Sequence, residues 1–331
     1  MAIPIALLVD DPAPLINVYW WHAARRCGPN PPAQLSGEPV AAKVPLSFLD
    51  EYIAVLQRWG VRGKFTVLPY PAGLGPIDEG WPGCDGVALA AWLERVRLHV
   101  APHMDITPEI LTHARAVDLE SMTLREQNER EWAQGQTAAT LTPYIALALE
   151  ILERVGLPAR GVTSPWDFGA QVEDQYRTAI RRAVAQVTGR TQTWYFLHTD
   201  AVSTRLRSEV VWRDGGGWLV SLWAQVHDHL WDTMETRDDS PAYVSALADA
   251  FVTEDGTSGR LVQLFAADTP MVLVTHWQSL FSNGRGTGLR ALDEVCRRVA
   301  RVWGPAVEWT TCSDLAAAIA AGRWDGGQAA R

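Results

Sequence analysis

Short apolar runs alternate with amphipathic stretches along most of this chain, which predicts β-strands alternating with α-helices. Strands are expected at residues 3–9, 64–68, 160–165, 194–197, 271–275 and 307–310, with a further strand after residue 95 that carries His99. Helices are expected at residues 47–59, 87–95, 143–155, 173–186, 240–251 and 289–303, and from residue 313 onward. Apolar strands that are buried on both faces by helices favour a β/α barrel or a doubly wound sheet.

Three segments interrupt this alternation. Residues from about 12 to 46 are rich in proline and long for a connection, which is typical of binding loops and lids. Residues from about 104 to 141 are polar, and we expect a helical insertion on a solvated face. Within residues 205–235, two apolar runs flank a glycine-rich turn, which predicts a β-hairpin. We therefore expect one domain over residues 1–331 with these three insertions.

Polar residues follow directly after several predicted strands, at the end where a barrel carries its active site. Asp10 and Asp11 end the first strand, and His276 ends the strand at 271–275. His99 and His103 lie four residues apart, a spacing at which both rings can lie on one side of the backbone. Imidazole is the commonest metal ligand near neutral pH, and a carboxylate is the usual third partner. These residues together predict a metal site with an open coordination position.

In this order the motifs resemble those of the polysaccharide deacetylase (NodB-homology, carbohydrate esterase 4-like) family of metal-dependent esterases and amidases. That family has an Asp-Asp after strand one, a His-x-x-x-His after strand three and a late strand that ends in a catalytic histidine. The resemblance implies an α/β fold, a distorted (β/α)7-type barrel with loop and hairpin insertions. It also implies that Asp10 is the general base, that Asp11, His99 and His103 hold the metal, and that His276 protonates the leaving group.

The chain departs from the family in its third motif. The family places an arginine before a Pro-x-Gly and uses it to orient the base, whereas residues 161–169 contain the proline and a glycine but no arginine at the matching position. Pro12 also replaces the glycine that follows the Asp-Asp. Asp167 and Arg285 are our candidates for supplying the contact that the arginine makes.

Aromatic residues near the predicted site are candidates for substrate binding. The chain has 16 tryptophans, and although most are expected in the core, flat aromatic faces suit sugar rings. We expect Trp166 and Trp277 to line the pocket, together with Asp167. His22, in the long N-terminal segment, is a further candidate for contact with substrate.

Other histidines offer alternatives to the predicted ligands. His227 and His229 would share one face of a strand and form a rival ligand pair, although no third partner is evident. His113 and His198 are expected at the surface or as hydrogen-bonded core residues.

Composition excludes several classes of function. The formal net charge is −9 and no block of Lys and Arg is present, which argues against a nucleic-acid partner. No apolar run reaches the roughly 18 residues that a membrane span needs. The N-terminal apolar run lacks the basic residues of a signal peptide, and the four cysteines are scattered, so a cytoplasmic protein with reduced thiols is expected.

The expected function is that of a metal-dependent hydrolase that removes an acyl group, first of all N-acetyl, from a carbohydrate or similar polar substrate. The partner would be a small molecule or an oligosaccharide, and the oligomeric state stays open. Zinc is the first choice of divalent metal, and cobalt and nickel fit the same ligands. Two alternatives remain: a sugar-binding barrel that has lost turnover, and a glycoside hydrolase on a related barrel.

Overall fold

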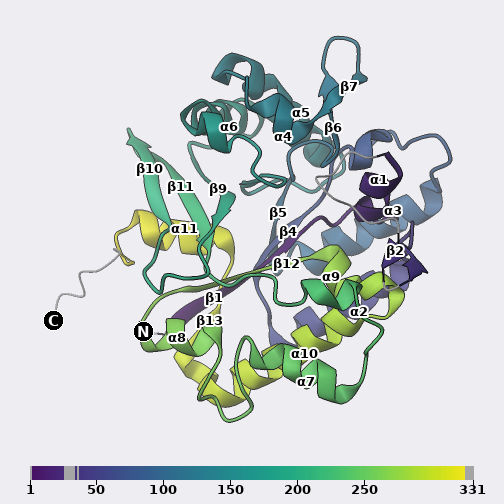
Figure 1. Cartoon of the computed structure of the whole chain (residues 1–331). Coiled ribbons are helices and arrows are strands. Elements are labelled where there is room, and N and C mark those ends of the chain that lie inside the picture. Colours follow the sequence, from purple (N-terminus) through teal and green to yellow (C-terminus); the bar gives the residue numbers. More distant parts are fainter. Residues whose placement is uncertain (1, 26–33, 36, 325–331) are drawn as a thin grey trace.

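Two mainly parallel sheets form the centre of the protein (Figure 1). The computed structural model describes residues 2–25, 34–35 and 37–324. One sheet has the strand order β12-β1-β4-β5, with β13 also paired to β1, and the other has the order β10-β11-β9-β8. The strands of these sheets are β1 (Ile3–Asp10), β4 (Gly63–Thr66), β5 (Met104–Thr107), β8 (Val162–Thr163), β9 (Gln192–Thr199), β10 (Glu209–Asp214), β11 (Gly217–Ala224), β12 (Met271–His276) and β13 (Val307–Trp309).

The two sheets are joined along both seams, which closes them into a distorted barrel. At one seam Glu109, just after β5, bridges in parallel to Thr163 of β8. At the other seam Val226, just after β11, bridges in parallel to Leu273 of β12. The amide of Ile110 donates to the Thr163 carbonyl at 3.0 Å, and the amide of Val226 donates to the Val272 carbonyl at 3.1 Å, so both seams are hydrogen-bonded. The predicted α/β fold, a distorted (β/α)7-type barrel, is confirmed.

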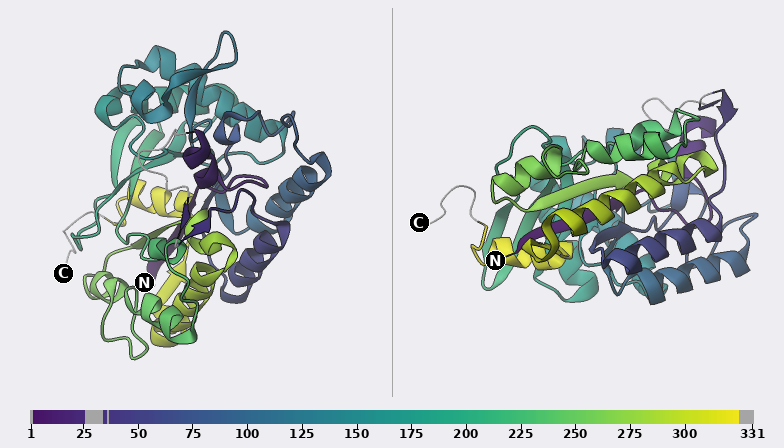
Figure 2. Two further views of the ribbon diagram at one scale, coloured as in Figure 1. Left: turned by 45° about the vertical axis from the view of Figure 1, so that its right-hand side comes forward. Right: turned by 90° about the horizontal axis from the view of Figure 1, so that it is seen from below.

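Helices cover the outside of the barrel. Figure 2 shows α10, α2 and α3 side by side along one flank, while α5 and α6 pack against each other on another. In the described chain, the α-helices are α1 (Val18–Arg25), α2 (Leu46–Trp59), α3 (Gly86–Arg95), α4 (Glu129–Ala133), α5 (Ala138–Arg154), α6 (Glu173–Thr188), α7 (Pro241–Asp249), α8 (Arg260–Ala266), α9 (Trp277–Phe281), α10 (Thr287–Trp303) and α11 (Cys312–Ala320). None of the described helices has the length and apolar character needed to cross a membrane.

The alternation of side chains along β1 decides what faces the barrel interior. Ile5 and Leu7 point outward and pack with the helices, whereas Ala6 and Leu8 point inward to a second apolar cluster. Asp10 continues this inward series at the carboxyl end of the strand. Leu315 and its neighbours on α11 belong to the same interior cluster, so α11 packs its apolar face onto the barrel interior.

The third barrel strand lies later in the sequence than predicted. After α3 the chain continues as a π-helical turn over Val96–Val100, and β5 begins only at Met104. Val96 and Val100 are both buried, at a spacing of four that suits one face of a helix. A strand would instead bury alternate residues, so the apolar positions of this segment fit the helix.

The polar segment from about 104 to 141 is not the helical insertion that we expected. It contains barrel strand β5, a loop, the hairpin β6 (Arg115–Asp118) and β7 (Thr123–Asn128), and the short helix α4. The next helix, α5, begins at Ala138 and not at Pro143, because Thr137 and Thr140 form a capping box ahead of it.

The two other predicted insertions contain short elements. Residues 12–46 hold α1 and the two-stranded pairing of β2 (Gln34–Leu35) with β3 (Glu38–Pro39). The predicted hairpin is present as β10 and β11, but β11 also pairs in parallel with β9. Only β10 therefore lies outside the barrel proper.

Candidate active site

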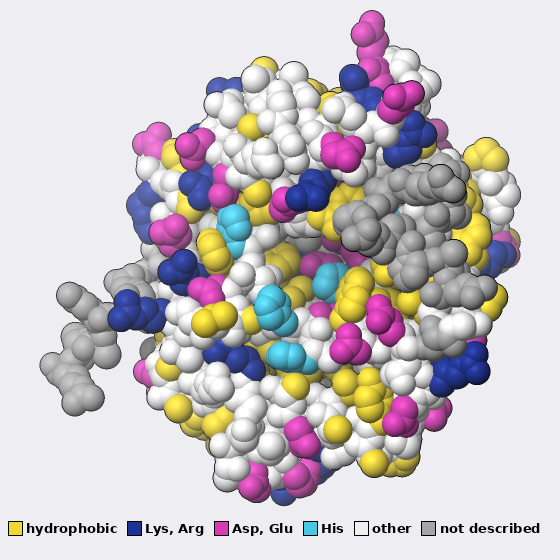
Figure 3. All heavy atoms as spheres, in the orientation of Figure 1, with side chains coloured by type: hydrophobic (Ala, Val, Ile, Leu, Met, Phe, Trp, Pro, Cys, Tyr) yellow, Lys and Arg dark blue, Asp and Glu magenta, His cyan; other side chains and the backbone are white. Residues whose placement is uncertain are grey.

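A pocket of about 990 Å³ opens at the carboxyl ends of the barrel strands. Figure 3 shows a hollow near the centre of this face, with histidine and acidic side chains gathered around it. Residues from the ends of several strands or from the loops after them line it, among them Asp10, Asp11, Glu109, His113 and His276. The pocket therefore lies where a β/α barrel places its chemistry.

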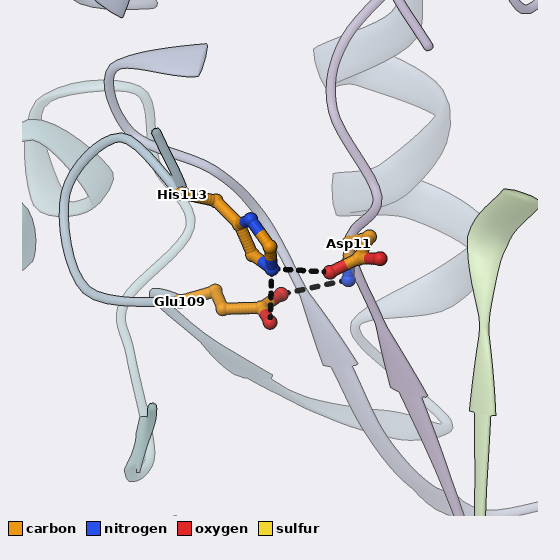
Figure 4. A group of neighbouring side chains, drawn as sticks. All are labelled: Asp11, Glu109 and His113. Atoms are coloured by element: carbon orange, nitrogen blue, oxygen red, sulfur yellow. Dashed lines mark hydrogen bonds and ion pairs between the residues drawn. The ribbon is translucent and has the colours of Figure 1, made fainter. Parts of the chain in front are cut away.

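Three side chains converge on one point in this pocket (Figure 4). Nε2 of His113 lies 2.8 Å from Oδ1 of Asp11 and 3.3 Å from Oε1 of Glu109. The backbone amide of Asp11 donates to Oε2 of Glu109 at 2.7 Å. All three residues are buried. Two carboxylates and one imidazole thus offer two oxygen atoms and one nitrogen atom to a common centre.

Unusual backbone conformations bring these side chains together. Asp11 has φ of +69°, in the left-handed region, so its side chain departs from the strict alternation that would set it opposite Asp10. Ile110 and His113, in the loop after β5, also have positive φ values of 40° and 49°. Non-glycine residues in this region cost conformational energy and cluster at functional sites.

The buried carboxylate of Glu129 holds the loop that carries His113. Its Oε2 accepts from the amide of His113 at 2.8 Å, and its Oε1 accepts from the amide of Thr112 at 2.9 Å and from the Tyr144 hydroxyl at 2.7 Å. Burial raises the pKa of Glu129 to about 7, and these hydrogen bonds act in the opposite direction. Glu129 therefore positions the loop without lining the pocket.

Further side chains orient the three converging groups. Gln278 donates to Oδ2 of Asp11, and the Thr66 hydroxyl donates to Oε2 of Glu109 at 3.1 Å. Nδ1 of His113 lies 3.1 Å from Nε2 of His22. Each of the three side chains thus has one atom in contact with an outer residue, while its other ligand atom faces the common centre. Metal sites have ordered outer contacts of this kind.

The residues fit a divalent cation. Oδ1 of Asp11 is buried and accepts no well-directed hydrogen bond from the described residues, although Nε2 of His113 is only 2.8 Å away. One proton on Nε2 cannot serve both Asp11 and Glu109, whereas a cation between them would. Burial and the charge of Asp11 raise the pKa of Glu109 to about 7, so the two carboxylates compete for positive charge.

The carboxylate of Asp10 lies in the same pocket but points to a different partner. It forms an ion pair with Nζ of Lys64, and both side chains are buried. Among the described residues, it is Lys64 that donates a hydrogen bond to this carboxylate.

His276 is oriented by Asp228. Nδ1 of His276 lies 2.8 Å from Oδ2 of Asp228, and the Ser279 hydroxyl donates to the same oxygen at 2.7 Å. Burial opposes protonation of His276, but the hydrogen bond to Asp228 and the charges of Asp11, Asp228 and Asp10 raise its pKa to about 9. The ring lines the pocket with Nδ1 engaged, which leaves Nε2 for a ligand.

The predicted ligand set of Asp11, His99 and His103 is not assembled, which corrects the sequence-based expectation. His99 is exposed and His103 is half-buried, and both precede β5. Because β5 runs parallel to β4 and β4 parallel to β1, both histidines lie at the amino end of the strands. Asp11 follows the carboxyl end of β1. The length of the barrel therefore separates the two halves of the predicted site.

The predicted substrate-binding residues take different positions. Trp166 and His22 line the pocket, and the Trp166 ring centroid lies 4.5 Å from that of His113. Asp167 pairs with Arg130 and does not line the pocket, which corrects that expectation. Trp277 is 2% exposed and packs in the core, because the first turn of α9 points it at the aromatic rings of α2 and β4.

The structure also bears on the sequence-based hypotheses about Arg285 and about the pair His227 and His229. Arg285 pairs with Glu38, so neither it nor Asp167 contacts Asp10. His227 lines the pocket, whereas His229 packs edge-on against Phe251. Within the described part of the chain, this pair is not among the groups whose donor atoms could share a metal ion.

Sequence reasoning missed Glu109 and His113. They have the spacing of four that we sought, and they follow the third barrel strand, but the first position is a glutamate. The strand before them has only four residues and alternates apolar with polar side chains. The available signal was therefore a Glu-x-x-x-His pattern after a short alternating run.

Comparison with known proteins gives the fold. No family model matches this chain, and no curated protein is significantly similar to it. A solved structure of a proposed polysaccharide deacetylase from Mycobacterium smegmatis superimposes with a TM-score of 0.54 at 17% identity, over 100% of this chain and 95% of that one. A structure described as T48 deacetylase with substrate has a TM-score of 0.42 at 10% identity, over 96% and 92% of the two chains. A family 4 carbohydrate esterase from Streptomyces lividans in complex with acetate has a TM-score of 0.36 at 11% identity, over 80% and 85%. Together with the closed strand order, the first of these shows that the chain shares the fold of that Mycobacterium smegmatis protein.

Proposed function

We propose that the protein is a metal-dependent hydrolase that removes an acyl group, first of all N-acetyl, from a carbohydrate. The observation that carries this proposal is the presence of Asp10, His276 and the Asp11–Glu109–His113 group in one pocket. A base, an acid and a cation site are the parts that hydrolysis of an amide or ester needs. The fold shared with the proposed deacetylase from Mycobacterium smegmatis agrees with this assignment.

Asp11, Glu109 and His113 are the proposed ligands of a divalent cation. When bound, such a cation supplies Lewis-acid chemistry, because it polarises a carbonyl oxygen and makes water more acidic. Two carboxylates and one imidazole form a harder donor set than the one carboxylate and two imidazoles expected from the sequence. We therefore place manganese beside zinc and cobalt as candidate metals, since oxygen-rich sites suit the harder ion.

Asp10 is the proposed base and His276 the proposed acid. As water attacks the acyl carbon, Asp10 accepts a proton from it, and the bond from carbon to the leaving nitrogen or oxygen breaks. His276 donates a proton from Nε2 to that leaving atom, because Nδ1 is held by Asp228. The products are the free carboxylic acid and an amine or alcohol. Asp10 then releases its proton to solvent and His276 takes one up, which restores the starting state.

Aromatic side chains support a sugar as the substrate. Trp166, Trp231 and Tyr19 line the pocket and present apolar surface near its acidic groups. Trp166 follows Pro165 with φ of +50°, a strained conformation for an aromatic residue that sets its ring beside His113. A sugar ring stacked on such a face would bring its acetamido group toward the proposed metal centre.

Acetate release tests this function directly. The protein is stripped with a chelator, reloaded separately with Mn²⁺, Zn²⁺ or Co²⁺, and incubated with N-acetylated chitooligosaccharides and O-acetylated xylan. Metal-dependent acetate release is the expected result. Sugar binding without acetate release would favour the inactive sugar-binding barrel, and new reducing ends would favour the glycoside hydrolase.

The pH dependence of the reaction provides a check on His276. Its pKa is raised to about 9, so the imidazolium persists into alkaline solution, and kcat/KM should fall as pH rises through about 9. Asp10, Asp11 and Asp228 face this ring, and a bound cation would offset the effect of Asp11. Replacing Asp228 by asparagine removes one of the charges that raise the pKa, so the alkaline limb should move to lower pH. An alkaline limb that stays in place in Asp228→Asn would show that His276 is not the acid.

A further inference from the structure

We propose that Lys64 positions the base: its ammonium group holds the Asp10 carboxylate in the orientation in which it accepts a proton from water. This inference rests on the proposed function. In the family that the motifs resemble, an arginine of the third motif orients the base. In this chain we assign that task to Lys64 of β4.

The contacts of Lys64 are specific to Asp10. The lysine side chain is fully buried. Among the described residues, Asp10 is the one whose carboxylate lies within ion-pair distance of Nζ. Nζ also lies 5.0 Å from the ring centroid of Phe196. Since Nζ contacts Oδ1 of Asp10 and Asp10 lines the pocket, the other carboxylate oxygen is left for a water molecule.

The strand register explains how a lysine reaches this position. Lys64 is aligned with Leu8 of β1, two residues before Asp10, so its side chain must extend along the barrel toward the pocket. The next inward residue of β4, Thr66, donates to Glu109. One strand therefore contacts both the proposed base and one proposed metal ligand.

Stability alone does not account for this ion pair. Among the neighbouring inward residues, Leu8, Phe196 and Val274 are apolar. Asp105, which is aligned with Lys64 on β5, is buried too, and its carboxylate accepts from the Ser313 amide at 2.6 Å. A buried ion pair in such surroundings is often no more stable than a well-packed apolar pair, because both charges lose their hydration. A buried charged pair beside this apolar cluster, with one member in the pocket, indicates a role in the chemistry.

No other cation takes this role in the described structure. Asp167 pairs with Arg130, and Arg285 pairs with Glu38. The third-motif segment contributes Ser164 and Trp166 to the pocket lining, and no arginine appears in that lining. The cation that contacts the proposed base therefore comes from β4.

The test compares Lys64→Met, which keeps the length without the charge, with Lys64→Arg, which keeps the charge. The substrate is a fully N-acetylated chitooligosaccharide or the acetylated sugar with the fastest wild-type acetate release. We expect kcat of Lys64→Met to fall by about 100-fold through misplacement of the base, with KM within about twofold of wild type. Lys64→Arg should recover at least about a tenth of wild-type kcat, and affinity for Mn²⁺ or Zn²⁺ should not change in either variant, because Lys64 contacts no proposed ligand.

A double variant separates positioning from a merely structural role. If Lys64 acts through Asp10, adding Lys64→Met to Asp10→Asn should lower kcat no further. The double variant has no buried charge at either position, so it should fold even if Lys64→Met alone does not. A further loss in the double variant, or Lys64→Met activity near wild type, would overturn the role of Lys64 and leave the hydrolase intact. A wild-type protein that releases no acetate from any substrate would instead overturn the proposed function and this inference with it.

Discussion

Replacement of His113 by alanine is expected to abolish metal retention and hydrolysis together. His113 contributes the nitrogen of the converging group, 2.8 Å from Asp11 and 3.3 Å from Glu109. Loss of an outer contact alone typically costs about 10- to 100-fold in metal affinity, so loss of a direct ligand should cost more. Metal content after dialysis and titration with Mn²⁺ or Zn²⁺ measure the first effect, and acetate release measures the second.

His103→Ala is the matched control, because it removes an imidazole from the other end of the barrel. This variant should keep its metal and its activity, and its free energy of unfolding should change by no more than about 0.5 kcal/mol, as for an ordinary surface position. Glu109→Gln keeps the volume of the side chain and tests the same site without deleting a buried ring. If His113→Ala and Glu109→Gln both retained full metal occupancy while His103→Ala lost it, the site would lie where the sequence first suggested.

Replacement of Asp10 by asparagine is expected to lower kcat by about 10² to 10⁴-fold, the usual contribution of a general base. Asparagine has nearly the same shape, and its amide oxygen can still accept a hydrogen bond from Lys64. The fold and the metal affinity should therefore survive, since Asp10 is not one of the three converging residues. Steady-state kinetics over the whole pH range, together with metal titration and thermal unfolding, separate these effects.

The corresponding control is Asp167→Asn, which alters a carboxylate in the loop after β8 that pairs with Arg130 outside the pocket. Its kcat should stay close to the wild-type value. Activity of Asp10→Asn within about tenfold of wild type would exclude Asp10 as the base, because a base contributes at least about 10². In that case Glu109, whose pKa burial and Asp11 raise to about 7, would be the next residue to test.

Local pattern was enough to predict the outline of the fold. The apolar run at 3–9, the helix that ends at Gly60 and the strand at 271–275 all appear where the sequence predicts them. Strand and helix periodicities are properties of neighbouring residues, so they can be read without knowing the partners. For the same reason the positions of Asp10 and Asp11 at the end of a strand, and of His276 at the end of another, were evident from the chain alone.

The tertiary structure decided which polar residues meet. A histidine pair at a spacing of four is compatible with a metal site, yet in this chain the segment with His99 and His103 continues a helix, and the strand starts after it. That shift moves the carboxyl end of the strand to Glu109 and His113. Which end of a strand a residue occupies depends on where the strand begins, and packing of Val96 and Val100 against the core fixes that boundary.

The partner of Asp10 was equally beyond local pattern. Lys64 lies 54 positions away in the sequence, and only the parallel register of β4 with β1 points its side chain at the carboxylate. The sequence by itself determined the alternation of strands and helices and the strand ends that carry the proposed acid and base, because these follow from short-range periodicity. The tertiary structure decided which residues form the proposed metal site and which cation contacts the proposed base, because such contacts depend on strand register and barrel closure between distant segments.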